Sequence, residues 1–332
     1  MYFLLGLSIA LAAMLVMNSV ASLLVSLLWK TVRRSATRWP AATRASVLCG
    51  LRILPVAFGV ACVTLLLVPA YFTHEPRTAH EDVSAKLAIL ALLSAVGIGL
   101  ALIRGIVTWR VTSRLTADWL SKATAVYLPG IRIPAYRMQH QFPVIAVVGT
   151  LRPRLFVANQ IFESLSRNEL AAAIEHEAGH ILAHDNLKRS LMRACRDTLL
   201  LVPYGRLLDS AWKEASEAAA DEHAVRGGAS VALDLAAALV KIARIVPPGA
   251  RPAMPAAALL VGSDDGQVSG RVRRLLKLAN GTERPRSNAF LSKAPMPITI
   301  GLTIVVATLA FNEPHVLATV HSIIEHGVQL LN

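Results

Sequence analysis

The sequence predicts a multi-span α-helical membrane protein that carries an α+β domain on the cytoplasmic side. The chain has 332 residues, of which 54% are hydrophobic, and a mean hydropathy of +0.51. Both values exceed those of an ordinary soluble domain. The apolar residues are concentrated in a few long stretches, whereas residues 109–294 mix strand-like and helix-like patterns with many charges. Membrane helices and a separate polar domain are therefore expected.

Three apolar stretches in residues 1–108 are long enough to cross a bilayer, since about 20 helical residues span its hydrocarbon core. A fourth stretch, after the polar domain, is shorter and needs its flanks to cross. A tail of residues 313–332 follows it. The predicted spans are residues 2–29, 48–72, 85–108 and 295–312.

The distribution of charge predicts the orientation. The connection between the first two spans carries only basic charges, whereas the next connection is mainly acidic and the C-terminal tail has no Lys or Arg. Basic loops stay in the cytoplasm. We therefore expect a bacterial inner membrane protein with both termini outside and residues 109–294 inside. The net charge of +13 then reflects topology and attraction to anionic lipid, and no nucleic-acid binding is expected. The basic residues of this region are Lys30, Arg33, Arg34, Arg38 and Arg44 in the first connection and Arg52 near the start of the second span.

Within the polar domain, two β-rich runs come first. "FPVIAVVGT" and "PRLFVAN" flank a turn signal at Gly149 and predict a small hairpin or sheet edge. Next, Ser166 and Glu169 have the spacing of a capping box. The apolar periodicity after them predicts a helix through "ELAAAIEHEAGHILAH". Three further helices are expected at residues 206–225, 232–246 and 270–280.

The helix through "ELAAAIEHEAGHILAH" contains the pattern H-E-x-x-H. His176 and His180 are four residues apart, so both can point toward one Zn²⁺ from one face of the helix. Glu177 is rotated by about 100° from His176, which places it beside the ion, where it can act as a general base. A catalytic zinc site has three protein ligands and an open position for water. One Zn²⁺ per chain and a third ligand from another element are therefore predicted.

Glu217 and Asp221 are four residues apart on the next helix and supply the missing groups. Glu217 would complete a His₂Glu set, with Glu214 and Glu222 as nearby alternatives. Asp221 would lie outside the ligand shell and accept a hydrogen bond from a ligand histidine. His223 is a candidate for stabilising the transition state, although a surface histidine is the simpler interpretation.

This set of groups predicts hydrolysis of peptide bonds. Zinc polarises the carbonyl, and Glu177 takes a proton from water and passes it to the leaving amine. An extended substrate could pair with residues 143–149 or 153–158 as an added strand. The alternative is that both runs are ordinary sheet core.

"LRPRLFVANQIFESLSRNELAAAIEHEAGHILAHDNL" together with "SEAAADEHAV" resembles the BlaR1/MecR1-type membrane metallopeptidases of family M56, which are gluzincins. Three spans before the zinc helix, one after it, and "SGRVRRLL" fit the same resemblance. It implies a zincin-like domain, with His176, His180 and Glu217 as zinc ligands and Glu177 as base. It also implies regulatory cleavage of a cytoplasmic transcriptional repressor or of the protein itself. Only residues 313–332 follow the last predicted span, so the penicillin-binding sensor of the β-lactam receptors is not expected in this chain.

Two other functions are weighed against this one. The first is an M48-type quality-control protease, which shares H-E-x-x-H and E-x-x-x-D. The HtpX arrangement of that family has spans between the histidines and the glutamate, and here "TLLLVPYGRLL" is too short to cross. The second is a non-catalytic zinc-binding signalling receptor, against which the intact Glu177 argues. Transport is disfavoured because the spans lack ionisable residues at their centres.

Overall fold

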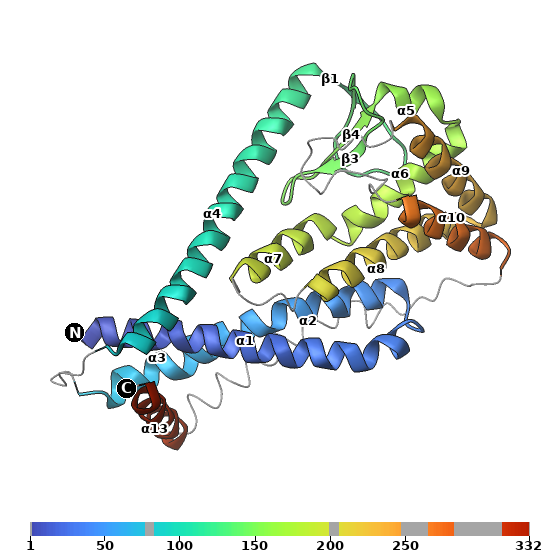
Figure 1. The fold of residues 1–332 in the computed structure, drawn as a ribbon. Coiled ribbons are helices and arrows are strands. Elements are labelled where there is room, and N and C mark those ends of the chain that lie inside the picture. The colour runs from blue at the N-terminus through green and yellow to red at the C-terminus, as the bar shows by residue number, and fades with distance from the viewer. Residues whose placement is uncertain (1, 77–82, 199–205, 247–264, 282–313, 332) are drawn as a thin grey trace.

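The structure is a computed structural model, and it describes residues 2–76, 83–198, 206–246, 265–281 and 314–331. Helices dominate, and a small mixed sheet lies between the end of one very long helix and the helices of the polar domain (Figure 1). The predicted combination of apolar helices with an α+β domain is therefore present in these residues.

Among the described residues, three long apolar helices could cross a membrane. The first two predicted spans fall within helices that are longer than the apolar stretches. The helix that contains the third predicted span continues well beyond it. The fourth predicted span, 295–312, lies outside the described residues. The helices are α1 (Tyr2–Ala36), α2 (Ala41–Cys62) continued by η1 (Val63–Leu67) and α3 (Val68–His74), and α4 (Ala85–Lys122).

The four-stranded sheet has the order β1-β2-β4-β3. β3 (Ile145–Val148) pairs antiparallel with β4 (Arg154–Ala158), so the predicted hairpin is confirmed. β4 also pairs in parallel with β2 (Ala135–Met138), which pairs antiparallel with β1 (Ala123–Val126). The sequence did not predict β1, which follows directly from the end of α4, or β2. β3 and β4 are almost wholly buried and form the centre of the domain core.

Helices cover the sheet and carry the motif residues. The three helices predicted after the zinc helix are all present, whereas α5 and α7 were not predicted. The capping box is also confirmed, because the Ser166 side chain accepts from the backbone of Glu169 and the Glu169 carboxylate accepts from that of Ser166. The helices are α5 (Asn159–Ser164), α6 (Arg167–Leu182), α7 (Asp185–Asp197), α8 (Arg206–Ala224) continued by η3 (Val225–Gly227), α9 (Ala229–Ile245) and α10 (Asp265–Ala279).

The polar domain packs directly on one end of the apolar helices. Trp212 and Ala215 of α8 share a buried cluster with Trp29 of α1 and Leu48 of α2. Two ion pairs cross the same interface, Arg44–Glu214 at 3.4 Å and Arg52–Asp209 at 3.2 Å. The basic α1–α2 junction and α8 therefore lie at the same end of the molecule, which agrees with the prediction that they share one side of the membrane.

The C-terminal helix α13 (Pro314–Leu331) lies at the other end of the apolar helices (Figure 1). Its Ile324 packs with Leu5 of α1 and Leu87 of α4, and its His321 stacks on His74 at 5.5 Å between ring centroids. α10 and α13 thus lie at opposite ends of these helices.

Candidate metal centre

The two motif histidines lie on the buried face of α6. Their rings meet edge to face with centroids 4.9 Å apart, as expected for positions one helical turn apart. His176 has no exposed surface, and the side chain of His180 is 15% exposed. Both rings are therefore held inside the domain instead of facing solvent.

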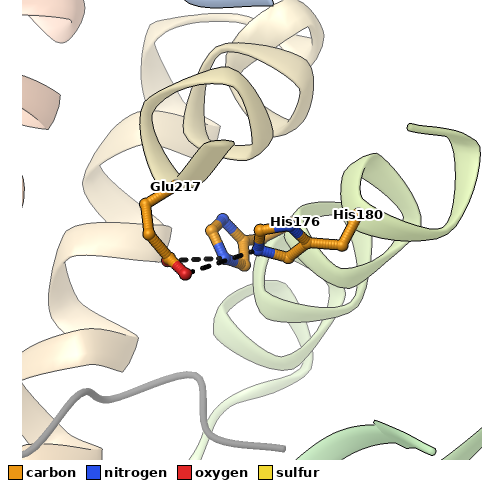
Figure 2. Close-up of side chains that lie close together, drawn as sticks. All are labelled: His176, His180 and Glu217. Carbon is orange, nitrogen blue, oxygen red and sulfur yellow. Dashed lines mark ion pairs between the residues drawn. The ribbon is translucent and has the colours of Figure 1, made fainter. Parts of the chain in front are cut away.

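Glu217 on α8 points its carboxylate at both rings (Figure 2). Its Oε2 atom lies 3.7 Å from His176 Nε2, and its Oε1 atom lies 3.8 Å from His180 Nε2. One donor atom from each of the three side chains lies within 4.8 Å of the others, a spacing that could hold a metal ion. The structure thus brings together the three predicted ligands.

Gly179 explains how α8 can come so close to α6. A Cβ atom at this position would lie 3.0 Å from Ala220 Cα and 3.2 Å from His223 Cβ. Contacts this short are rarely tolerated, so a larger residue would push the helices apart and draw Glu217 away from the histidines. The second variable position of the H-E-x-x-H motif therefore has a packing role that the sequence analysis did not recognise.

Each histidine has a carboxylate behind it. Asp221 Oδ1 lies 3.0 Å from His176 Nδ1, the contact predicted from the sequence. His180 Nδ1 has an equivalent contact of 2.7 Å with Asp185 Oδ2, which was not predicted. Both aspartates are buried. Such contacts fix the imidazole so that its Nε2 atom faces the site.

Arg271 of α10 is a charged neighbour that the sequence analysis missed. Its guanidinium contacts both oxygens of Asp221, at 2.6 and 3.2 Å, and lies 3.1 Å from Glu217 Oε2. It also approaches the His176 ring at 3.3 Å. The three arginines of "GRVRRLL" gave no sign which one turns inward, since the contact depends on how α10 packs on α9 and α8.

The remaining candidate residues lie outside this group. Glu214 has a side chain 78% exposed, and its ion pair is with Arg44. Glu222 makes a very short contact with Arg274, and His223 lies 3.9 Å from Glu175. His184 is exposed and adopts a left-handed conformation, with φ of 54°, between α6 and α7. A transition-state role for His223 stays a prediction.

Glu177 is 6% exposed and follows His176 directly. Burial raises the pKa of its carboxyl, although the two histidines act in the opposite direction. A general base works best when its pKa approaches the working pH, so this environment suits the predicted role.

The charges of the group are strongly coupled. Burial alone would raise the pKa of Glu217, but the nearby His176, His180 and Arg271 lower it to about 2. For His176, burial and Arg271 lower the pKa, whereas Asp221 and Glu217 outweigh them and raise it to about 9. A metal binds neutral imidazole, so protons and metal compete for this nitrogen.

The donor set fits zinc. Ligands about 2.0–2.1 Å from a tetrahedral ion are about 3.4 Å apart, and the separations of 3.7 and 3.8 Å between Glu217 and the two Nε2 atoms are close to that value. Two imidazoles and one carboxylate are a ligand set of catalytic zinc sites. The buried carboxylates behind the histidines add the support that such ligands need.

A cleft of about 1520 Å³ reaches the group from the side of α8. Its walls come from the α1–α2 junction, α8 and α10, and they include Glu217 and Asp221. The Glu217 carboxylate is therefore accessible from the junction of the first two apolar helices.

Comparison with known families decides between the peptidase families considered above. The sequence profile of peptidase family M48 matches residues 143–295, which include the zinc helix, α8 and α10. Over this region the chain is similar to M48 peptidases. Members of that family are zinc metalloproteases, so the match indicates a metallopeptidase domain. No curated protein matches the chain significantly.

The resemblance to BlaR1/MecR1-type peptidases of family M56 is wrong. M48 is a different family, and the profile match is to M48 with none to M56. The resemblance relied on H-E-x-x-H and E-x-x-x-D, which both families share, and on the number of spans. The lack of spans between the histidines and Glu217 also proved insufficient to exclude M48. The interpretation as a BlaR1-like signalling protein loses its basis with this correction.

Proposed function

We propose that this protein is a membrane-anchored zinc endopeptidase of the M48 type. The observation that carries the proposal is the convergence of His176, His180 and Glu217, with Glu177 beside His176. The M48 similarity of the same segment supports it independently. The family match favours a role in the quality control of membrane proteins over cleavage of a repressor.

In this proposal His176, His180 and Glu217 hold one Zn²⁺, with Asp221 and Asp185 orienting the two rings. Bound zinc would polarise the scissile carbonyl and increase the acidity of water. Glu177 accepts a proton from the attacking water and donates it to the leaving amine. The burial of Glu177 keeps its carboxyl group away from bulk solvent while the group holds that proton.

An extended substrate would pair with β3. This strand pairs with only one other strand among the described residues, whereas β4 pairs on both sides. The prediction that residues 153–158 could receive a substrate strand is therefore wrong, and the sheet-core alternative holds for them. Asn186 Nδ2 donates to the carbonyls of Val147 and Gly149, at 2.9 and 3.1 Å, which limits the length of edge that a substrate could use.

The orientation remains part of the proposal. We place the metal group on the cytoplasmic side of a bacterial inner membrane, because the α1–α2 junction beside it carries the basic residues. The lipid bilayer and a protein or peptide are then the expected partners.

The test is Glu177→Gln in the full chain, purified in detergent with zinc. We expect casein cleavage to fall about 10²–10⁴-fold, as for loss of a general base, while zinc content stays that of the wild type. Glu175→Gln is the matched control, since Glu175 lies on the same helix with a side chain 43% exposed. If Glu177→Gln cleaves as fast as the wild type, Glu177 is not the base.

A further inference from the structure

The C-terminal end of α7 contacts the middle of two apolar helices. Asn18 of α1 is 2% exposed and donates from Nδ2 to Thr198 Oγ1 at 3.3 Å. On α4, a Cβ atom at Gly97 would lie 2.6 Å from the Thr198 carbonyl oxygen, so only glycine permits the contact. Asn18 and Gly97 are near the centres of the apolar stretches 2–29 and 85–108. A residue that touches the centres of two spans lies near the midplane of the bilayer.

Several charged side chains around this end of α7 are paired. Asp197 lies 3.0 Å from Arg104 of α4, and Arg196 contacts both Asp197 and Asp209. Asp209 in turn pairs with the buried Arg52 of α2. Charged side chains within a bilayer are expected to be paired, because an isolated charge is costly there. The C-terminal end of α7 and the N-terminal end of α8 therefore have the contacts expected of elements inserted among membrane helices.

The outer face of α7 also suits lipid. Leu187 and Leu191 are one turn apart, and they are 41% and 44% exposed. Comparable apolar side chains on α1 and α4, such as Leu24 and Ile103, are exposed at 60% and 58%. A common covering of acyl chains would bury all of them.

The length of α7 fixes the depth of the metal group. Its 13 residues cover about 20 Å at a rise of about 1.5 Å per residue. Asp185, at the opposite end from Thr198, contacts His180 directly. Half of a bilayer measures about 15 Å for the hydrocarbon and about 20–22 Å with headgroups. From Thr198 near the midplane, α7 therefore reaches only as far as the headgroups.

We infer that the metal group lies at the level of the lipid headgroups and that its substrates are membrane-anchored chains cut within a few residues of a span. Only the part of this inference that concerns substrates rests on the proposed peptidase function. A soluble domain on a tether would reach loops far from the membrane. Here α7 and α8 hold the ligands at one depth, so a scissile bond must come to that depth.

Depth can be measured without activity. Nitroxide labels are placed at Leu187→Cys and Leu191→Cys in the full chain in lipid vesicles, with Glu163→Cys as the aqueous control. Glu163 is exposed on α5, remote from α1 and α2 (Figure 1). We expect both α7 labels to collide more with oxygen than with an aqueous nickel complex, position 191 being the deeper, and the control to show the reverse. α7 labels that behave like the control would overturn the inference.

The substrate class is tested with two single-span substrates in proteoliposomes. Each carries the same unstructured casein-derived sequence, placed either directly beside the span or behind a long polar spacer. We expect at least 10-fold faster cleavage beside the span. Equal rates would overturn the substrate inference while leaving the peptidase function intact. If Glu177→Gln cleaves both substrates as the wild type does, or neither is cut, the proposed function fails and the label depths still decide where the metal group lies.

Discussion

At the scale of single residues, the candidate site consists of a local motif and a set of distant contacts. His176, Glu177 and His180 could be recognised from spacing alone, because a helix fixes how they face. Glu217 and Asp221 could be predicted as a pair on one helix face but not placed against the histidines. Arg271 could not be found from its own surroundings, since it meets Asp221 only after α10 has packed.

Arg271→Gln tests the role of this arginine. Removing the guanidinium leaves the buried Asp221 and the partly buried Glu217 with less countercharge, and breaking a buried ion pair costs about 3–5 kcal/mol. We expect a lower unfolding temperature in detergent, and added zinc should restore part of it by binding the native state. Arg273→Gln is the control, because Arg273 is exposed on the same helix. If both variants unfold alike, Arg271 does not neutralise the buried carboxylates.

At the scale of elements, the sequence predicted helix boundaries correctly where particular residue types mark the start or the end of a helix. The capping box marked the start of α6, and glycines or prolines marked the ends of α8 and α9. α7 was not predicted, although its apolar residues Leu187, Leu191, Met192 and Cys195 recur at helical spacing on one side of the helix. That side is divided in the fold, because Met192 and Cys195 are buried against protein whereas Leu187 and Leu191 are exposed.

The start of α6 gives a prediction on pH. Burial tends to raise the pKa of Glu169, but hydrogen bonds from Lys241 and Ser166 lower it below its ordinary 4.5. A lowered folded-state pKa contributes stability above the unfolded-state value, and this contribution is lost as the pH falls through the folded-state value. Glu169→Gln keeps the capping geometry and removes the charge. It should therefore lower the unfolding temperature at pH 7 and have less effect below pH 4.5. An equal effect at both pH values would exclude the pairing with Lys241.

At the scale of the whole molecule, hydropathy predicted four spans, and the three in residues 1–108 are long helices of the described chain. Charge predicted that the α1–α2 junction and the polar domain lie together. Sequence patterning could not show that the domain packs on α1, α2 and α4, because Arg44, Arg52 and Arg104 find their partners in α7 and α8 only in the fold. The short motifs H-E-x-x-H and E-x-x-x-D could not distinguish peptidase families M48 and M56 either, because both families share them. The profile over residues 143–295 uses the residues between those motifs as well.

The two ends of the molecule should lie on opposite sides of the membrane. Glu163→Cys on α5 and Ile323→Cys on α13, which is 64% exposed, are treated with an impermeant thiol reagent in intact spheroplasts. We expect labelling at position 323 at once and at position 163 only after the membrane is opened. Immediate labelling at both positions would exclude a crossing between α10 and α13, and the reverse pattern would invert the orientation.

The convergence of α6 and α8 on one zinc ion is tested most directly by the metal content of two variants of α8. Glu217→Ala removes the carboxylate that faces both histidines, whereas Glu214→Ala removes one that is 78% exposed and pairs with Arg44. After purification in detergent and dialysis against a weak chelator, we predict about one zinc per chain for the wild type and Glu214→Ala, and a large loss for Glu217→Ala. Undiminished zinc in Glu217→Ala, or loss in Glu214→Ala alone, would contradict the ligand set.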